Sequence, residues 1–451
     1  MSYVDEVLAQ VEARDANEPL FLQTVREVLN SLRPMIDPNE EKYRKIALLE
    51  RLVEPEKTVI FRVPWTDDKG VAHVNRGYRV QFNSAIGPYK GGLRFAKNVT
   101  LDTIKFLAFE QCFKNSLTTL PIGGGKGGSD FDPIGKSDAE VMRFCQSFMT
   151  ELYRYIGANT DSPAGDMGVG AREIGFLYGQ YKRITGNFEA AAVTGKSPEY
   201  GGSLGRPTAT GFGAVYYAEE LIKTLGKDIK GSTIAISGFG QVAWGVAMKA
   251  TQLGAKVVSI SGPDGYVYDK DGMNEEKVAF LLDMRANDPM HCKPYADKFG
   301  AEFHEGQKPW GRVKADYYMP CAMQNDVNLE EAKRMVEEGT CKVLIEVANM
   351  PTTQEAIDFL REKGWVVAPS KAVNAGGVAV SAMEMAQDAS KYYWTEEEVE
   401  EKLHAIMKDI FNSSLKAAKK YGLDGVNALI EGANLAAADK IVTSMVAQGI
   451  V

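Results

Sequence analysis

One segment of the sequence constrains the fold more than any other, because it joins strand, turn, helix and strand in a fixed order. Residues 233–260 read TIAISGFGQVAWGVAMKATQLGAKVVSI. An apolar strand runs into a glycine turn, and a helix follows that ends at Gly254, before a second apolar strand. Gly238 permits the tight turn, Gly240 lets another group approach the backbone, and the small Ala243 allows close helix–strand packing. The segment predicts one strand–helix–strand unit of a parallel sheet.

The turn of this unit predicts a site for the pyrophosphate of a nicotinamide dinucleotide. Free N–H groups and the dipole at the start of a helix favour an anion, and the pattern G-x-G-x-x-A places the pyrophosphate there. We expect Gly238, Gly240 and Gln241 at the turn, and Ser261 at the end of the second strand, to contact the coenzyme. The alternative is a glycine turn in an α/β core that binds nothing.

The choice between NAD and NADP depends on the end of the second strand, which reads SISGPD over residues 259–264. A carboxylate at the strand end normally binds the adenosine ribose 2′-hydroxyl. Here the strand ends without one, and Asp264 comes later. Nothing at the strand end repels a 2′-phosphate, and Arg285 is available to pair with one. We therefore expect NADP or NAD, with a slight preference for NADP.

Length and composition exclude several classes of protein. A chain of 451 residues predicts two or three domains, and 45% hydrophobic with 25% charged residues is ordinary for a globular protein. A net charge of −8 argues against a nucleic-acid partner. No apolar run is long enough for a membrane helix, and the acidic N-terminus lacks an apolar signal core, so we expect a cytoplasmic protein. The five cysteines and four histidines form no metal-binding pattern, so no metal is expected.

The chain divides near residue 200, at the glycine-rich stretch YGGSLGRPT. Before it, the patterns predict a mixed α/β domain, with helices at 21–32 and 136–157 and strands at 59–65 and 78–83. Ser137 and Glu140 have capping-box spacing. Beyond the boundary, apolar strands alternate with helices, which predicts a parallel sheet covered on both faces. Besides those already quoted, strands are expected at 316–322, 343–349 and 365–370.

Three lysines in the first domain predict an anion-binding site. Lys90 lies in PYKGG and Lys126 in PIGGGKGG, both of which resemble glycine turns. A helix from about Asp102 places Gln111 and Lys114 on one face, directed together toward a ligand. A solvated surface role is the alternative for any single lysine, but three of them in one glycine-rich, largely apolar stretch favour a common site.

Crowded lysines in a desolvated site lose their protons more easily, so one of them can act as a base near neutral pH. Asp166 lies among prolines, glycines and small apolar residues, where a carboxylate can exchange protons with a substrate; the alternative is a turn-forming aspartate. A phosphate loop of an NTPase is not expected, because Gly127 rather than Ser or Thr follows Lys126 and no clear strand precedes the loop.

Five motifs make the sequence resemble the hexameric glutamate dehydrogenases, within the glutamate, leucine, phenylalanine and valine dehydrogenase family, over essentially the whole chain. They are GPYKGGLRF (87–95), FEQCFKNSLTTLPIGGGKGGSDFDP (109–133), PAGDMGVGAREIG (163–175), ATGFG (209–213) and KAVNAGGVAVSAMEM (371–385).

The resemblance implies an α/β protein with a mixed substrate-binding and oligomerisation domain at 1–200. It also implies a Rossmann-type NAD(P)-binding domain at 201–424, helices at about 425–451 that pack back on the first domain, and a cleft that closes between the domains. The implied partners are L-glutamate, 2-oxoglutarate, ammonium and five further copies of the chain in a homohexamer. The implied reaction is reversible oxidative deamination of L-glutamate with hydride transfer to NAD(P)+.

Carried over by motif, the resemblance implies a role for each site residue. Lys90 and Ser381 would hold the side-chain carboxylate of glutamate, and Lys114 and Gln111 its α-carboxylate. Lys126 would activate water, and Asp166 would relay protons to and from the amino group. For the coenzyme, the residues implied are Thr210 and Asn374 near the nicotinamide and Asn349 near its ribose.

Three segments depart from the family pattern: Gln241 replaces the usual asparagine, Met323 replaces a common threonine, and residues 432–440 are altered. The first departure puts the hydrogen bond to the nicotinamide amide in doubt. Two other functions stay open. A leucine or phenylalanine dehydrogenase would need an apolar pocket in place of Lys90 and Ser381. A non-catalytic sensor of 2-oxoglutarate would be expected to lack Lys126 or Asp166.

Overall fold

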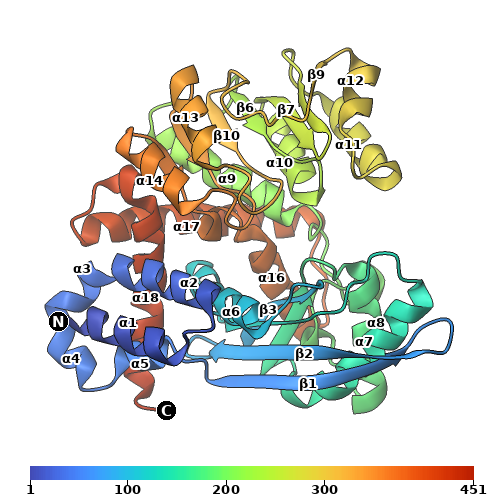
Figure 1. Cartoon of the computed structure of the whole chain (residues 1–451), viewed down its shortest axis with the longest axis vertical. Coiled ribbons are helices and arrows are strands. Elements are labelled where there is room, and N and C mark those ends of the chain that lie inside the picture. Colours follow the sequence, from blue (N-terminus) through green and yellow to red (C-terminus); the bar gives the residue numbers. More distant parts are fainter. The chain divides into compact units, whose positions relative to one another are not determined.

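The computed structural model describes all 451 residues, which form two compact units (Figure 1). The first unit comprises Met1–Arg206, Val378–Val399 and Asn434–Val451, and the second comprises Pro207–Gly377 and Glu400–Ala433. The first unit thus contains residues 378–399, a segment that the sequence patterns did not assign to it. The unit boundaries fall inside three helices, which are α16 (Gly376–Ser390), α17 (Glu396–Lys420) and α18 (Leu429–Gln448).

The first unit is a five-stranded sheet with helices. The strands are β1 (Lys57–Thr66), β2 (Ala72–Asn83), β3 (Tyr89–Phe95), β4 (Gly123–Ser129) and β5 (Asp161–Gly165). The helices are α1 (Tyr3–Arg14), α2 (Pro19–Ser31), α3 (Arg33–Ile36), α4 (Glu40–Arg44), α5 (Leu48–Leu52), α6 (Leu101–Leu117), α7 (Asp138–Leu152) and α8 (Ala171–Thr185). Single 3₁₀ turns lie at Asp37–Asn39, Tyr153–Tyr155, Ala190–Ala192 and Pro198–Tyr200.

The strand order in this sheet is β1-β2-β4-β3-β5. β2 is antiparallel to both β1 and β4, whereas β3 is parallel to both β4 and β5. The register places Lys126 of β4 opposite Val80 of β2, and Gly124 opposite Lys90 of β3. The two glycine-rich lysine segments are therefore neighbouring strands of one sheet.

The prediction that GGGKGG is a loop is wrong, because these residues form β4, in which every residue is buried. Glycine is usually unfavourable in a strand, since it has no side chain to pack. Here the missing side chain is what the packing requires. A Cβ on Gly124 would lie 2.2 Å from Sγ of Cys112 on α6, and one on Gly127 would lie 2.7 Å from Cδ2 of Leu93. The PYKGG segment is likewise part of a strand, β3, and not a turn.

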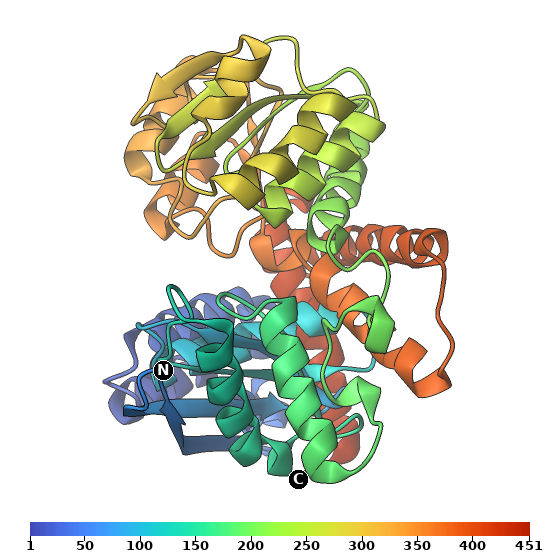
Figure 2. The ribbon, with the colours of Figure 1, turned by 90° about the vertical axis from the view of Figure 1, so that its right-hand side faces the viewer.

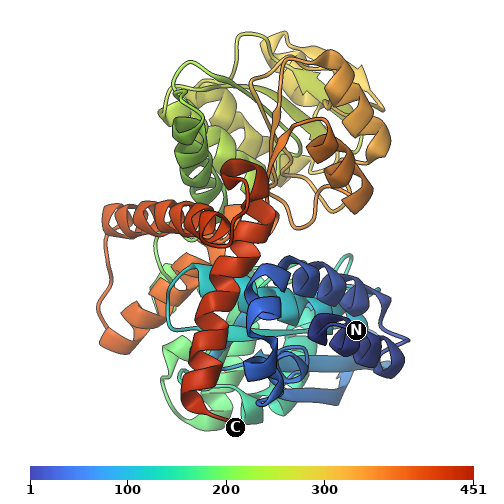
Figure 3. The ribbon, with the colours of Figure 1, turned by 90° about the vertical axis from the view of Figure 1, so that its left-hand side faces the viewer.

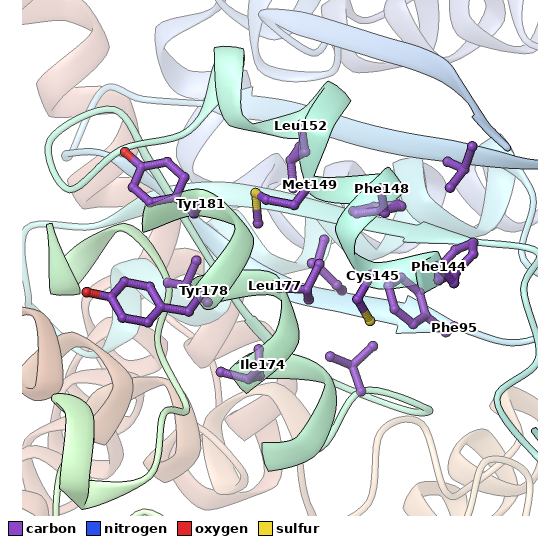
Figure 4. Packing of buried hydrophobic residues seen from close by; sticks show 14 of the residues in the cluster. Phe95, Phe144, Cys145, Phe148, Met149, Leu152, Ile174, Leu177, Tyr178 and Tyr181 are labelled. Carbon is purple, nitrogen blue, oxygen red and sulfur yellow. The ribbon is translucent and has the colours of Figure 1, made fainter. Parts of the chain in front are cut away.

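Two helices cover the opposite face of the sheet from α6. α7 begins with the capping box predicted from the sequence, in which Ser137 Oγ accepts from Glu140 N at 3.1 Å and Ser137 N donates to Glu140 Oε2 at 3.0 Å. Figure 4 shows side chains of α7 and α8 pointing toward one another and toward Phe95 of β3. Phe131 stacks on Phe144 in the same core, with ring centroids 3.7 Å apart.

α18 packs on the first unit with its C-terminal part (Figure 3). Asn434 Nδ2 donates to Ser31 Oγ at 2.9 Å, next to the N-terminal helices. Ser116 Oγ, near the end of α6, donates to the carbonyl of Ala437 at 2.9 Å. These bonds join segments more than 300 residues apart in the sequence.

The second unit is built on a seven-stranded sheet with the order β12-β11-β10-β6-β7-β8-β9. The strands are β6 (Thr233–Ile236), β7 (Lys256–Gly262), β8 (Gly265–Tyr268), β9 (Glu302–Glu305), β10 (Tyr317–Met319), β11 (Val343–Ile345) and β12 (Val366–Ala368). The helices are α9 (Ala209–Thr224), α10 (Gln241–Gln252), α11 (Glu275–Asn287), α12 (Lys293–Phe299), α13 (Leu329–Glu338), α14 (Gln354–Glu362) and α15 (Ser370–Val373), with a 3₁₀ turn at Gly425–Ala428.

The predicted parallel sheet with helices on both faces is confirmed for β6, β7, β10, β11 and β12 (Figure 2). A core cluster lies between the sheet and the pair α13 and α14, and it includes Met335, Leu344 and Leu360. The sequence patterns missed β8 and β9, which extend the sheet in antiparallel fashion. Both are only four residues long, which is too short for a clear periodicity, and β9 consists mainly of polar residues that are exposed or half-buried.

Three further observations concern the whole chain. None of the helices combines the length and the apolar character that a membrane crossing would demand. No group of three or more His, Cys, Asp and Glu side chains is arranged to hold a metal ion. All five cysteines are buried free thiols.

The close contact between β4 and α6 leads to a stability prediction. Gly124→Ala would place a methyl group 2.2–2.7 Å from atoms of Cys112, so α6 must move. We expect a loss of roughly 1–3 kcal/mol in the free energy of unfolding, as for other overpacked cores. Gly179→Ala in α8 is the matched control, because a Cβ there meets nothing within 4 Å and should stabilise the helix by about 0.5–1 kcal/mol. Thermal unfolding at equal protein concentration measures both, and an unchanged midpoint for Gly124→Ala would contradict the packing argument.

Candidate functional site

The residues predicted to bind substrate all belong to the first unit, and those predicted to bind coenzyme all belong to the second. In the first unit, Lys90 lies on β3, Gln111 and Lys114 on α6, and Lys126 on β4. Asp166 follows β5, and Ser381 lies on α16. β3 pairs with both β4 and β5, and α6 packs directly on β4, so the fold gathers the first five of these residues although up to 76 positions separate them.

The centre of this group is an ion pair between Lys126 and Asp166, whose Nζ and Oδ2 atoms lie 2.9 Å apart. Arg94 of β3 donates from Nε to the same carboxylate oxygen at 3.0 Å. All three side chains are largely shielded from solvent, with 7%, 18% and 14% of Lys126, Asp166 and Arg94 exposed. One carboxylate therefore faces two cations in a nearly dry environment.

This environment shifts the pKa of both partners. Burial lowers the pKa of Lys126, the carboxylate of Asp166 opposes that shift, and the charge of Arg94 adds to it. Burial alone would raise the pKa of Asp166, but the charges of Lys126 and Arg94 outweigh it and hold that pKa well below its ordinary value. The lysine is thus easier to deprotonate than a free lysine, while the carboxylate stays ionised as long as both cations are charged.

Lys114 is a further, half-buried cation near this pair, and its Nζ makes no hydrogen bond or ion pair within the protein. Burial, followed by repulsion from Lys126, lowers the pKa of Lys114 to about 8. Gln111 lies one turn earlier on α6 and donates from Nε2 to Asn115 Oδ1 at 2.7 Å. Asn115 in turn donates to the carbonyl of Lys90 at 3.0 Å and to that of Gly123 at 2.5 Å, which ties α6 to β3 and β4.

Lys90 is completely buried, and burial lowers its pKa well below the ordinary value. Its Nζ donates to the carbonyl of Ser162 at 2.8 Å and to Thr194 Oγ1 at 2.6 Å. Both acceptors are neutral, whereas an ammonium group has three N–H donors and a full charge. The protein therefore leaves one donor of this buried cation, and its charge, without a carboxylate partner.

Ser381 lies next to a further cation that the sequence reasoning missed. Arg206 donates from Nε to Ser381 Oγ at 3.2 Å. Burial lowers the pKa of Arg206, and the negative charge of Glu384 opposes this shift. The reasoning also missed Arg94 and Thr194. Arg94 belongs to the motif GPYKGGLRF and could have been predicted from it. No sequence signal pointed to Thr194 or Arg206.

In the second unit, the predicted dinucleotide turn is present between β6 and α10. Gly238 has a φ of +77°, which favours glycine, and its N–H donates to Ser261 Oγ at the end of β7 at 3.0 Å. Gly240 is the N-cap of α10, and a Cβ placed on it would meet nothing within 4 Å. The first N–H groups of α10 are therefore approachable, as a pyrophosphate requires.

Gln241 and Arg285 pair with each other. Arg285 Nη1 donates to Gln241 Oε1 at 2.6 Å, and Gln241 Nε2 donates to the carbonyl of Pro207 at 2.7 Å. Both ends of the Gln241 amide are thus engaged within the protein. A contact of either residue with a coenzyme would have to add to these bonds or replace them.

Asn349 and Asn374 lie together beyond the ends of β11 and β12. Asn374 Nδ2 donates to Asn349 Oδ1 at 2.8 Å and to the carbonyl of Val347 at 3.0 Å. The Oδ1 atom of Asn374 is buried without a hydrogen-bond partner, which is unusual and marks a place where a ligand donor would fit. Thr210 lies in the first turn of α9, and its side chain makes no hydrogen bond within the protein.

The fold and these two groups of residues define a class. A sheet with an approachable glycine turn at a helix N-terminus, in one chain with buried lysines around a carboxylate, is an α/β oxidoreductase of the dehydrogenase type. The family model "Glutamate/Leucine/Phenylalanine/Valine dehydrogenase" matches residues 201–449, and "Glu/Leu/Phe/Val dehydrogenase, dimerisation domain" matches residues 55–183. The chain belongs to this family, as the sequence motifs predicted.

Relatives match along the whole chain. The NAD-specific glutamate dehydrogenase of Clostridium symbiosum is 59% identical over 450 residues, which are 99% of each chain. The NADP-specific glutamate dehydrogenase of Haemophilus influenzae is 51% identical over 447 residues, covering 99% of this chain and 98% of that one. Among solved structures, Plasmodium falciparum glutamate dehydrogenase matches with a TM-score of 0.95 at 47% identity, over 99% of this chain and 94% of that one.

The ion pair at the centre of the first group gives a testable consequence. Asp166→Asn removes the anion that holds the proton on Lys126, so the pKa of Lys126 should fall further below that of a free lysine. Asp132→Asn is the control, because Asp132 pairs at 3.4 Å with the exposed Lys97. ¹³C-methylation of the lysines followed by NMR titration measures the pKa. A Lys126 titration midpoint that is equal in Asp166→Asn and in the unaltered protein would refute the coupling.

Proposed function

We propose that the protein is a glutamate dehydrogenase. It converts L-glutamate, water and NAD(P)+ reversibly into 2-oxoglutarate, ammonium, NAD(P)H and a proton. The observation that carries the proposal is a set of three lysines in the first unit: buried Lys126 paired with Asp166, and buried Lys90 and half-buried Lys114 without carboxylate partners. A substrate with two carboxylates and one amino group supplies two anions for the two unpaired lysines and a reacting centre for the pair.

In this proposal, Lys90 holds the side-chain carboxylate of glutamate, assisted by Ser381. The buried ammonium of Lys90 lacks an anionic partner, and burying a charge is costly unless it is paired. Lys114, with Gln111 one turn away on α6, holds the α-carboxylate. Arg206, which hydrogen-bonds Ser381, adds positive charge at the distal end.

Lys126 and Asp166 carry the proton transfers. Neutral Lys126 removes a proton from the water that attacks the substrate's imine carbon, and its lowered pKa makes the neutral form accessible. Asp166 relays protons to and from the substrate nitrogen. It is strongly acidic while Lys126 is charged, so it accepts a proton readily only once Lys126 has become neutral. The protonation of each group therefore depends on the protonation of the other.

The coenzyme supplies the hydride acceptor for the α-carbon when it is bound. Gly238, Gly240 and the N-terminus of α10 fit its pyrophosphate, because the turn is open and the N–H groups are approachable. Ser261 lies beside this turn and would contact the same end of the coenzyme. Gln241 is placed at the helix start, although its amide is engaged within the protein. We further assign Thr210, Asn349 and Asn374 to the nicotinamide end, on the strength of the unpartnered Asn374 Oδ1.

We propose NAD as the preferred coenzyme, in place of the slight preference for NADP that the strand end suggested. The carboxylate of Asp264 accepts from the N–H groups of Cys292 and Lys293 at 2.9 and 3.0 Å. Its Oδ1 lies only 2.6 Å from where a Cβ of Gly262 would stand, so its charge lies at the end of β7. This negative charge would repel a 2′-phosphate at the end of β7, and Arg285 is already hydrogen-bonded to Gln241. The relative at 59% identity is named NAD-specific.

Two other functions are less consistent with the site. A leucine or phenylalanine dehydrogenase would place an apolar side chain against Lys90, which is fully buried and charged when protonated. A non-catalytic sensor of 2-oxoglutarate would have no need for the Lys126–Asp166 pair, which is intact.

We also propose that the first unit is the substrate-binding and oligomerisation domain and the second the coenzyme-binding domain of a cytoplasmic homohexamer. The match of residues 55–183 to a dimerisation domain supports assembly. The structure of hetero-hexameric glutamate dehydrogenase from Thermus thermophilus matches with a TM-score of 0.82 at 28% identity. Five buried free thiols suit a reducing compartment. Sedimentation velocity should show one species of six chains.

The assay that tests the function follows absorbance at 340 nm with glutamate, leucine or phenylalanine and either NAD+ or NADP+. We expect turnover of glutamate, with the higher kcat/KM for NAD+. Lys126→Met should lower kcat by about 10²–10⁴-fold, the usual contribution of a general base, while the Kd for NADH stays unchanged. Lys97→Met is the control, since 83% of the Lys97 side chain is exposed. Turnover of only apolar amino acids, or near-normal kcat in Lys126→Met, would reject the proposal.

The lowered pKa of Lys114 predicts how affinity depends on pH. An anion at Lys114 raises the pKa of this lysine, so the binding energy is fully present below its free pKa of about 8 and is lost above it. The Kd for 2-oxoglutarate, measured by calorimetry, should therefore begin to rise above about pH 8. Lys114→Met should bind more weakly at pH 7 and lack this inflection. An inflection near pH 8 that persists in Lys114→Met would assign the titration to another group.

A further inference from the structure

A buried charge cluster in the first unit has no part in the reaction described above. Lys196 Nζ lies 2.7 Å from Glu384 Oε1 and 3.0 Å from Asp388 Oδ2. The side chains of Lys196 and Glu384 are fully buried, and 2% of Asp388 is exposed. Glu384 and Asp388 are one turn apart on α16. Burying three charges costs several kcal/mol per ion before pairing, so a cluster of this kind calls for an explanation.

Glu384 has more bonds than a simple partner of Lys196 would need. Besides Lys196 Nζ, its carboxylate accepts from the backbone N–H of Gly195, at 3.0 and 3.1 Å to its two oxygens, and from that of Lys196 at 3.3 Å. Lys196 Nζ also donates to the carbonyl of Val193 at 2.5 Å. One carboxylate on α16 therefore fixes the backbone of residues 193–196.

The segment that Glu384 fixes carries Thr194, which contacts a proposed substrate residue. Thr194 Oγ1 accepts from Lys90 Nζ at 2.6 Å. Its own backbone N–H donates to the carbonyl of Pro163, in β5, at 3.0 Å. On α16 itself, Ser381 lies three residues before Glu384 and accepts from Arg206. Glu384 thus joins both sides of the group that would hold the distal carboxylate.

We propose that Glu384 is a positioning residue for the distal-carboxylate end of the substrate site, and that it helps the protein to distinguish a dicarboxylic from an apolar amino acid. It acts through Thr194 on Lys90, and through α16 on Ser381 and Arg206. This inference rests on the proposed function, because the distal carboxylate belongs to the proposed substrate.

Electrostatics support the same role. Burial lowers the pKa of Lys90, and the negative charge of Glu384 is the largest effect that opposes this shift. Asp161 also opposes it, whereas the cations Arg79 and Arg206 add to it. Glu384 likewise opposes the lowering of the pKa of Arg206. Its charge is shared with Lys196, so it favours protonated Lys90 without forming an ion pair that would block Lys90 from an anion.

The alternative is that the cluster has only a structural role and holds α16 against the segment at 193–196. In that case its loss would lower stability but leave the discrimination between dicarboxylic and apolar ligands unchanged. The two hypotheses therefore predict different results in a ligand-binding measurement and not only in a melting temperature.

The test compares Glu384→Gln with Asp388→Asn. The first substitution removes the charge and replaces an oxygen that accepts from the 193–196 backbone. The second removes a charge from the same lysine but touches none of those backbone groups. Glutarate, a dicarboxylate without an amino group, is the binding probe, and calorimetry gives its Kd. Glutamate and norvaline, which have equal chain lengths, give the discrimination ratio in kcat/KM.

For Glu384→Gln, we expect the Kd for glutarate and the KM for glutamate to rise about tenfold or more, with kcat within a few-fold of normal, as for loss of a charge-assisted contact. The preference for glutamate over norvaline should fall by a similar factor. As the pH is raised, the affinity for glutarate should begin to fall at a lower pH than in the unaltered protein. The reason is that removal of the Glu384 charge lowers the pKa of Lys90, so Lys90 becomes neutral earlier. Asp388→Asn should leave the preference for glutamate within about twofold.

If Glu384→Gln folds and retains the normal preference for glutamate and the normal pH profile, the inference is overturned. If Glu384→Gln does not fold, Thr194→Val replaces it as the test. Thr194→Val removes only the hydroxyl that accepts from Lys90, and it should weaken glutarate binding; normal glutarate affinity in Thr194→Val would then overturn the inference. Failure of the unaltered protein to bind glutarate or to oxidise glutamate would instead refute the proposed function.

Discussion

The contact between α6 and the glycine strand β4 is the constraint on which the rest of the first unit depends. Gly124 lets the helix backbone at Cys112 lie directly on the strand, and Gly127 leaves room for Leu93 and for the side chain of Arg79. β4 is therefore buried throughout, and Lys126 is the one long side chain that it contributes. The same packing that stabilises the sheet removes water from around Lys126.

Removal of water gives each buried cation a different character according to its partners. Lys126 is paired with Asp166, Lys90 has two neutral acceptors, and Lys114 has none within the protein. An unpaired charge with little access to water is unfavourable, so the buried Lys90 and the half-buried Lys114 both favour the binding of an anionic ligand. Lys196 is the contrast, because two carboxylates and the carbonyl of Val193 accept from its ammonium group, and it serves the architecture of the site. In the second unit, the feature suited to binding an anion is the open N-terminus of α10 at Gly240.

Several features were predictable because they depend on local chemistry. The strand–turn–helix–strand unit at 233–260 follows from apolar periodicity and from the glycine at position 238. The φ of +77° that the turn requires there is one that glycine adopts readily. The capping box at Ser137 and Glu140 follows from side-chain reach within one turn. β4 was not predictable in this way, since a run of glycines has turn propensity and no apolar pattern. Its strand character comes from β2, β3 and α6, which surround it.

By itself, the sequence determined the family, the two-part α/β plan and the identity of the residues that carry charge. These are encoded in short motifs, in which the interacting groups are close along the chain. Tertiary structure decided which charges meet. Asp166 lies between Lys126 and Arg94, and Glu384 reaches across 188 positions to the backbone of Lys196 and so to Thr194 on Lys90. Proton affinities and ligand preference depend on distance and on the exclusion of water, and both exist only once segments remote in sequence have packed together.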